Sequence, residues 1–323
     1  MTTTAKRRWG ADFRGEIDGI SFTDKGPVFI HGYDPPAGGK WIDDVIPGKL
    51  GAFDRSTGDS LWVSPCEVGY GRGFGAGLGE EDDVVILGPS SSGHRIARMK
   101  IASGELIGAS DIRAFDQAVV RGDMCVTVTS GRVAGIMTTP MFEAWSFQRD
   151  GERYHLVGRD GEVALVVYTD TNRSKQGVLV VDVDSGDYLG TFLDAEYNVI
   201  HEMCVHDGTV TLLTGTGSSR NSAHAETLTL SAFRKVGGEA QPLWSERVDN
   251  DSSDGLPDVS ILVDSGKLYV ARGAALTVRD VLSGRDLGAL TIPGLDERIA
   301  WAVAEGAGLL AEEDRMAIFE LPA

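Results

Sequence analysis

The sequence has 323 residues, of which 42% are hydrophobic and 24% are charged. These values are ordinary for a folded globular protein and argue against a disordered chain. The 48 acidic residues outnumber the 30 basic ones and give a formal net charge of −18. Binding to a nucleic acid backbone requires clustered Lys and Arg, so we expect no nucleic acid partner.

The N-terminal segment MTTTAKRRWGADFRGEID (1–18) carries basic residues with no apolar run behind them. Secretory signals and transmembrane helices both need such a run, so we expect a cytoplasmic protein that makes no membrane contact. The cysteines, Cys66, Cys125 and Cys204, are far apart and lack CxxC spacing. This pattern predicts reduced thiols in a reducing compartment.

Short β-branched runs separated by DG, SG and GG turns recur from one end of the chain to the other. No window of a dozen residues shows helical periodicity without glycine or turn signals, which predicts an all-β fold. The clearest runs, in chain order, are DDVVILG (82–88), DMCVTVTSG (123–131), EVALVVYTD (162–170), TVTLLTG (209–215), KLYVARG (267–273) and GLLAEED (308–314).

One phrase returns along the chain: a strand, a tight turn at Ser-Gly or Thr-Gly, and a second strand that begins with an apolar residue. Its copies are AFDRSTGDSLW (52–62), RMKIASGELIG (98–108), VVDVDSGDYLG (180–190) and VRDVLSGRDLG (278–288), with weaker copies AWSFQRDGERY (144–154) and SAFRKVGGEAQPLW (231–244). The glycines of these turns recur at an average spacing of about 45 residues, which is typical of four-stranded propeller blades.

The phrase D-x-x-T/S-G-x-x-L-W/G resembles the repeat of the quinoprotein-like (PQQ-like) β-propellers. In that family the repeat lies at the hairpin between the third and fourth strands of a blade, and the resemblance covers nearly the whole chain. The closing Trp is present at Trp62 and Trp244, whereas glycine replaces it at Gly108, Gly190 and Gly288. The cofactor residues of quinone-binding members find no match here, so PQQ is not expected.

Dividing 323 residues by the repeat spacing predicts a single β-propeller domain over residues 1–323 with seven four-stranded blades. Six and eight blades are alternatives, because the repeats between about 110 and 193 are poorly phased. The segment KRRWGADF (6–13) resembles a fourth strand with Trp9 in the Trp position. It is predicted to complete the last blade, which would close the ring and remove its exposed sheet edges.

In GYGRGFGAGLG (69–79) every second residue is glycine. This is the period of a β-strand, and no helix follows that could bind a phosphate at its N-terminus. We expect the innermost strand of the second blade here. Its bare face would either allow close packing against the neighbouring blade or leave room for a ligand beside the central channel.

The longer loops are predicted to lie on one rim of the propeller, which makes that rim the expected functional face. Imidazole and carboxylate groups there could perform acid–base chemistry, and several imidazoles together could bind a divalent metal. The candidate catalytic residues are His201, His31, His94 and Asp116. The candidate substrate-binding residues are Tyr70, Arg72, His224, Arg298 and Trp301. The candidate metal ligands are His31, His94, His201 and His224.

Three functions fit this pattern. The first is an enzyme that acts on a small molecule at the channel mouth by His and carboxylate acid–base chemistry, with or without a metal, as a lyase, hydrolase, isomerase or cyclase. The second is a noncatalytic scaffold for a protein partner. The third and most remote is a PQQ-dependent dehydrogenase, which only the resemblance to the repeat family supports.

Overall fold

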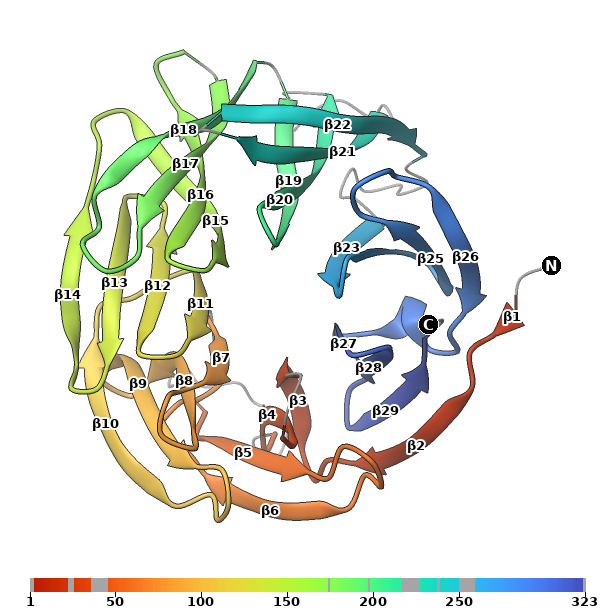
Figure 1. Cartoon of the computed structure of the whole chain (residues 1–323). Coiled ribbons are helices and arrows are strands. Elements are labelled where there is room, and N and C mark those ends of the chain that lie inside the picture. The colour runs from red at the N-terminus through yellow and green to blue at the C-terminus, as the bar shows by residue number, and fades with distance from the viewer. Residues whose placement is uncertain are drawn as a thin grey trace.

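The protein is all-β and folds into a ring of seven four-stranded antiparallel sheets (Figure 1). The computed structural model describes residues 3–22, 26–35, 46–71, 73–173, 175–196, 198–216, 227–236, 239–249 and 259–321. One short 3-10 helix, η1 (Leu295–Glu297), is the only helical element among these residues. The predicted single propeller with seven blades is therefore confirmed.

We name the blades A to G in chain order and give their strands from the innermost to the outermost. Blade A contains β3 (Glu16–Ser21), β4 (Val28–Tyr33), β5 (Gly48–Phe53) and β6 (Ser60–Pro65). Blade B contains β7 (Gly75–Leu78), β8 (Asp83–Ser90), β9 (Gly93–Lys100) and β10 (Leu106–Ile112). Blade C contains β11 (Gln117–Arg121), β12 (Met124–Thr129), β13 (Arg132–Thr138) and β14 (Met141–Phe147). Blade D contains β15 (Glu152–Asp160), β16 (Val163–Asp170), β17 (Lys175–Asp182) and β18 (Tyr188–Glu196).

The remaining three blades follow the same order. Blade E contains β19 (Asn198–His206), β20 (Thr209–Thr216), β21 (Thr227–Val236) and β22 (Glu239–Val248). Blade F contains β23 (Val259–Asp264), β24 (Lys267–Arg272), β25 (Ala275–Asp280) and β26 (Asp286–Thr291). Blade G contains β27 (Ala300–Ala304), β28 (Ala307–Ala311), β29 (Arg315–Glu320) and β2 (Arg7–Asp12).

The N-terminal strand closes the ring, as predicted. β2 pairs antiparallel with β29, so that Arg7 lies opposite Phe319 and Asp12 opposite Arg315. The chain before it also adds a short strand, β1 (Thr3–Thr4), in parallel to the outer edge of blade F. Residues 3–12 therefore bridge blades G and F.

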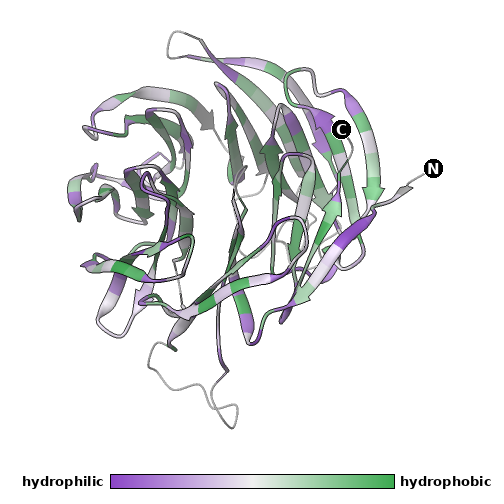
Figure 2. Cartoon of the chain, turned by 60° about the horizontal axis from the view of Figure 1, so that its bottom comes forward, coloured by the Kyte–Doolittle hydropathy of each residue, from purple (hydrophilic) through white to green (hydrophobic). Residues whose placement is uncertain are grey.

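The core lies within and between the blades, because the middle strands are buried on both faces. β4 and β8 are buried along their whole length, and apolar residues concentrate along the strands (Figure 2). Burial on both faces explains why these strands read as continuous apolar runs. Among the described residues, no helix is long and apolar enough to cross a membrane. Cys66, Cys125 and Cys204 form no disulfide.

Four blade junctions are held by a tryptophan of one outermost strand that reaches the next blade. Each indole N–H donates to a backbone carbonyl in the turn between the third and fourth strands of that blade. The pairs are Trp9 with Arg55 at 2.8 Å, Trp62 with Ile101 at 2.7 Å, Trp145 with Val183 at 2.7 Å, and Trp244 with Val281 at 2.9 Å. We call this arrangement the Trp latch.

The glycine of each receiving turn lies against the indole ring. A Cβ atom at these positions would be 2.5 to 2.7 Å from a ring atom, and their φ angles are positive, between +67° and +80°. The glycines are Gly58, Gly104, Gly186 and Gly284. Both close approach and left-handed backbone therefore require glycine, which explains the Ser-Gly and Thr-Gly signature of the repeat.

The weaker copy of the repeat at 144–154 does not coincide with the hairpin between the third and fourth strands of its blade. Gly151 lies between blades, after β14 and before β15, whereas the corresponding hairpin of blade C turns at Thr139 and Pro140. This turn contains no glycine, so the repeat glycine could not be found there. Trp145 nevertheless occupies a latch position.

The alternating glycines of 69–79 pack against the neighbouring blade. β7 is the innermost strand of blade B, as predicted. A Cβ atom at Gly75 would lie 2.8 Å from Ala118 Cβ, and one at Gly77 would lie 2.6 Å from Val120 O, both in β11. The bare face of this strand thus serves close packing between blades B and C.

Candidate functional site

A polar cavity of about 580 Å³ lies at the mouth of the central channel, where blades E, F and G meet. Innermost strands contribute Glu202 from β19, Ser260 from β23 and Trp301 from β27. The loop between β26 and β27 contributes Arg298. The complete lining is Glu202, Val259, Ser260, Gly273, Asp296, Arg298, Ile299 and Trp301. We call this cavity the EFG pocket.

Arg298 is held in place by its own loop and by blade F. Its guanidinium donates from Nη1 to Leu295 O at 2.6 Å and from Nη2 to Ser260 Oγ at 2.7 Å. Burial lowers the pKa of Arg298, and the charges of Glu202 and Asp296 oppose that shift. A guanidinium remains charged in proteins, so the pocket contains a fixed positive charge.

Ser260 receives two hydrogen bonds. The indole Nε1 of Trp301 donates to Ser260 Oγ at 2.9 Å, in addition to the Arg298 bond. A serine hydroxyl has two acceptor lone pairs and one hydrogen to donate. Both lone pairs are occupied by groups that can only donate, and within the described parts of the chain no acceptor lies within hydrogen-bond distance of its own O–H. The O–H of Ser260 can therefore donate to a group that enters the pocket.

Glu202 supplies a second ionisable group beside Arg298. Its Oε2 accepts the backbone N–H of Ile261 at 2.6 Å. Burial raises the pKa of Glu202 to about 7, against the opposing effects of the Ile261 N–H and of Arg298. At neutral pH this carboxyl group therefore exchanges a proton readily, which is the property of a general acid or base or of a pH-sensitive binding group.

Arg298 and Trp301, two of the predicted substrate-binding residues, lie together in the structure. Their side chains stack, with the guanidinium 5.8 Å from the centre of an indole ring. Glu202 and Ser260 were missed. Glu202 directly follows the candidate His201 in the sequence, and Ser260 lies near the start of an ordinary strand, β23. Only the meeting of three blades reveals them.

His31 is fully buried within blade A. Its Nδ1 hydrogen-bonds to Asp18 Oδ1, and its Nε2 lies 3.1 Å from Val68 O. A backbone carbonyl can only accept, and a carboxylate accepts as well, so both ring nitrogens carry protons. Burial alone lowers the pKa of His31, but hydrogen bonds with Asp18 and Cys66 outweigh it and raise the pKa to about 10. An imidazolium has no lone pair for a metal or a substrate proton.

The other candidates are dispersed. His94 lies against Phe115, with ring centres 5.1 Å apart, and Asp116 is exposed at the start of blade C. Tyr70 packs against Tyr33 at 4.3 Å. His201 is the extra residue of a β-bulge between Ile200 and Glu202, and it does not line the EFG pocket. Arg72 and His224 lie outside the described residues.

The predicted histidine cluster does not assemble in the part of the chain that the structure describes. No group of three or more His, Cys, Asp or Glu side chains with metal-binding geometry occurs among those residues. The quinone for which the fold family is named carries several carboxylates and requires several cationic partners. The EFG pocket offers one guanidinium beside Glu202 and Asp296, so its residues do not fit that group.

No family model and no curated protein matches this sequence. Among solved structures, the chain is similar to the crystal structure of BamB from Moraxella catarrhalis, with a TM-score of 0.51. The alignment covers 98% of this chain and 100% of that chain at 13% sequence identity. An identity this low shows the fold alone. The comparison confirms at the level of fold the resemblance to PQQ-like β-propellers that the repeat predicted.

Proposed function

We propose that this propeller binds a small carboxylate ligand in the EFG pocket. The proposal rests on Ser260. Arg298 and Trp301 occupy both lone pairs of its hydroxyl, so this hydroxyl can donate a hydrogen bond to a ligand but cannot accept one. The guanidinium beside it adds a fixed positive charge and a planar array of donors suited to a carboxylate.

The apolar residues that line the rest of the pocket indicate which group the ligand carries beside its carboxylate. The Trp301 ring and Ile299, which is 51% exposed, flank the two donors. An aromatic or aliphatic group attached to the carboxylate would cover this exposed apolar surface. We therefore expect benzoate to bind more tightly than acetate, and both to bind more tightly than a cation of the same size.

Binding, rather than the acid–base catalysis by histidine that the sequence suggested, is the activity that these contacts support. His31 is held as an imidazolium, and His201 and His94 do not line the EFG pocket. Burial raises the pKa of the lining residue Glu202 to about 7, which suits a general acid or base at neutral pH. An enzymatic reaction in this pocket would therefore have to use Glu202.

A protein-interaction role is the second candidate, and exposed apolar side chains favour it. In each outermost strand we consider the residue just before the latch Trp or before the residue that replaces this Trp. It lies at a β-bulge, and in five blades it is Leu or Ile. These are Leu61, Ile107, Leu189, Leu243 and Leu287, each between 37% and 56% exposed. They line the circumference of the ring, away from the EFG pocket, and the scaffold function stays a prediction.

Isothermal titration calorimetry with benzoate, acetate and phosphate tests the first proposal. We expect benzoate to give the highest affinity and Arg298→Gln to weaken it at least tenfold, since a hydrogen bond to a charged group contributes about 1.5–3 kcal/mol. Ser260→Ala should cause a similar loss, and Ser260→Thr, which retains the hydroxyl, should recover most of it.

Arg315→Gln is the matched control, because it removes the same charge from an exposed position of blade G outside the EFG pocket. Its affinity for benzoate should equal that of the wild type. The proposal fails if no anion binds at millimolar concentration, or if Ser260→Ala binds benzoate as tightly as the wild type.

A further inference from the structure

The junction between blades F and G differs from the latched junctions. Gly288 takes the place of the Trp in β26, and nothing lies within 4 Å of where its Cβ atom would be. The third and fourth strands of blade G, β29 and β2, come from opposite parts of the sequence, so no hairpin turn joins them to receive an indole. We call this junction the F–G seam.

On its outer side the F–G seam is held by residues 3–5. Thr3 and Thr4 pair with Leu290 and Thr291 of β26, and the Ala5 N–H donates to Thr291 O at 2.9 Å. Because β2 follows directly and belongs to blade G, this segment ties the two blades together (Figure 1). The segment joins the two blades by backbone hydrogen bonds at their outer edge, where the latched junctions use the indole N–H of a tryptophan.

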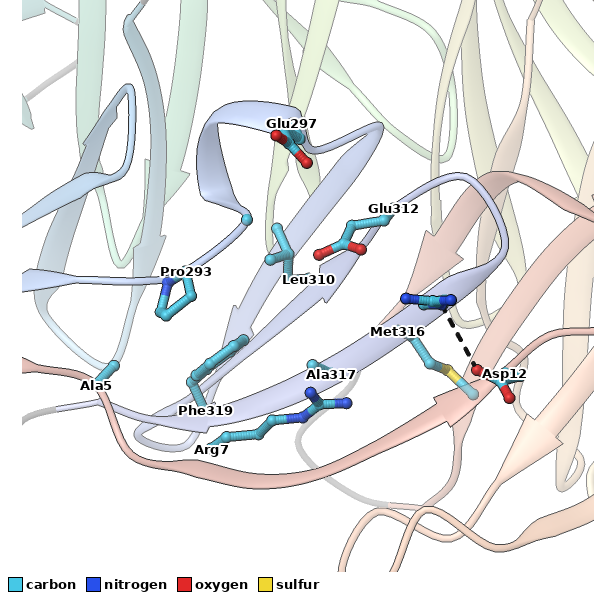
Figure 3. A pocket seen from close by; sticks show the side chains of 12 residues that line it. Ala5, Arg7, Asp12, Pro293, Glu297, Leu310, Glu312, Met316, Ala317 and Phe319 are labelled. Atoms are coloured by element: carbon cyan, nitrogen blue, oxygen red, sulfur yellow. Dashed lines mark ion pairs between the residues drawn. The ribbon is translucent and has the colours of Figure 1, made fainter.

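Packing at the F–G seam leaves space on this side as well. A cavity of about 560 Å³ lies beside the N-terminal segment, lined by that segment, by the loop between β26 and β27 and by blade G. Ala5, Pro293 and Phe319 border it at one end, and Asp12, which pairs with Arg315 at 4.0 Å, borders it at the other (Figure 3). The seam thus has a cavity on its outer side and the EFG pocket on its channel side.

On the channel side, two polar side-chain contacts across the seam meet at one atom, Ser260 Oγ. Arg298, from the loop that leads into blade G, and Trp301 of blade G both donate to Ser260 Oγ of blade F. A ligand that accepts from Ser260 and from Arg298 at once can do so only while the two blades are together. Such a ligand binds the closed ring in preference to an opened one.

We infer that the F–G seam opens more readily than the latched junctions, and that a carboxylate in the EFG pocket holds it closed. This inference rests on the proposed function. A ligand that binds only the closed form suppresses opening in proportion to 1 + [L]/Kd. At a ligand concentration of 100 times Kd, opening of the seam should therefore fall about 100-fold.

Hydrogen exchange followed by mass spectrometry on the full chain tests this with benzoate as the probe. Without ligand, peptides from β26 and β29 should exchange faster than peptides from β5 and β8, whose blades A and B share a latched junction. Benzoate at 100 times its measured Kd should slow exchange in β26 and β29 by up to 100-fold and change β5 and β8 little. In Arg298→Gln the same concentration should have little effect.

Ala5→Pro provides an independent arm, because proline removes the N–H that pairs with Thr291 O. It should speed exchange in β26 and β29 further, whereas Thr4→Ala, which keeps the backbone pairing, should not. Benzoate should restore part of the protection lost in Ala5→Pro.

The outcomes separate the two proposals. Benzoate that binds by calorimetry without slowing exchange at β26 and β29 would overturn the seam inference and leave the proposed function standing. Absence of benzoate binding would overturn both. Seam peptides that exchange no faster than those of the latched blades would also overturn the inference, whatever the ligand does.

Discussion

At the scale of single residues, His31 shows how burial changes the role of a side chain. The sequence placed it among the rim histidines that could bind a metal. In the structure its ring stacks on Phe74 at 4.6 Å, and both nitrogens face acceptors. The pair that it forms with Asp18 is a structural element of blade A, because a buried charge persists only with such partners.

The His31–Asp18 pair should make stability depend on pH. The pKa of His31 is raised in the folded state to about 10 from its ordinary 6.5. Its contribution to stability is therefore complete below about pH 6.5 and is lost as the pH rises toward 10. Urea unfolding between pH 6 and 10 should show a falling free energy of unfolding.

His31→Gln removes the titrating group from the same site. It should lower the free energy of unfolding at pH 6 by about 3–5 kcal/mol, the usual cost of breaking a buried pair, and flatten the pH dependence. Tyr154→Phe, a buried substitution in another blade, should leave the slope unchanged. An unaltered slope in His31→Gln would contradict our assignment.

Glu202 should couple carboxylate binding to protonation. Its pKa is raised to about 7, and the charged groups around it in the EFG pocket are Arg298 and Asp296. Ionised Glu202 repels an incoming carboxylate and attracts Arg298, so the affinity for benzoate should rise as the pH falls from 8.5 to 5.5. The limiting slope is about tenfold per pH unit, for one proton taken up.

Calorimetry at several pH values measures this dependence. Glu202→Gln should bind benzoate with an affinity nearly independent of pH, whereas Asp296→Asn, at an exposed position, should keep most of the pH dependence. A wild-type affinity that does not change over this range would remove Glu202 from the binding site.

At the scale of elements, the Trp latch explains why the repeat is incomplete. A tryptophan is present wherever the next blade offers a Ser-Gly or Thr-Gly turn, and glycine replaces it before blades C, E and G, which carry no such turn. Each receiving turn has the same backbone, with the glycine N–H bonded to the carbonyl four residues earlier. The two halves of the latch therefore depend on each other although they lie on different blades.

The junction between blades E and F tests this dependence. Trp244→Phe keeps an aromatic ring and removes the bond to Val281 O, which should cost about 1 kcal/mol. Gly284→Ala should cost more, because φ is +68° and the new Cβ would lie 2.7 Å from the indole. Urea unfolding measures both, with Gly131→Ala as the control.

Gly131 has open space around the position of a Cβ and no unusual φ, so its alanine variant should change stability by less than about 0.5 kcal/mol. In the double variant Trp244→Ala with Gly284→Ala, the cost should be smaller than the sum of the single costs, since the clash disappears with the ring. Simple additivity would show that the turn and the tryptophan are independent.

At the scale of the whole molecule, the fold could be predicted because a propeller repeats one pattern. The spacing of the turn glycines predicts the number of blades, and Trp9 predicts the closing strand. The phase of blade C could not be predicted, since its hairpin at Thr139 and Pro140 uses another turn. A repeat is detectable only where its local chemistry is kept.

The site could be predicted only in part, for a related reason. Arg298 and Trp301 lie close together in sequence and belong to one rim, so both were candidates. Glu202 and Ser260 come from other blades, and their contact with Arg298 depends on how three strands converge on the channel. His31 was placed on the rim by its position in the chain, but its burial depends on the packing of Phe74 from the next blade.

The closure of blade G by β2 also sets an order of events during synthesis. β2 leaves the ribosome first among the blade strands, yet its pairing partner β29 is made last, since Arg7 pairs with Phe319. At about 5–20 residues per second, the first strand waits roughly 15–60 s for its partner. During this time the other six blades can form, while the strand that completes the seventh stays unpaired and open to capture by another chain.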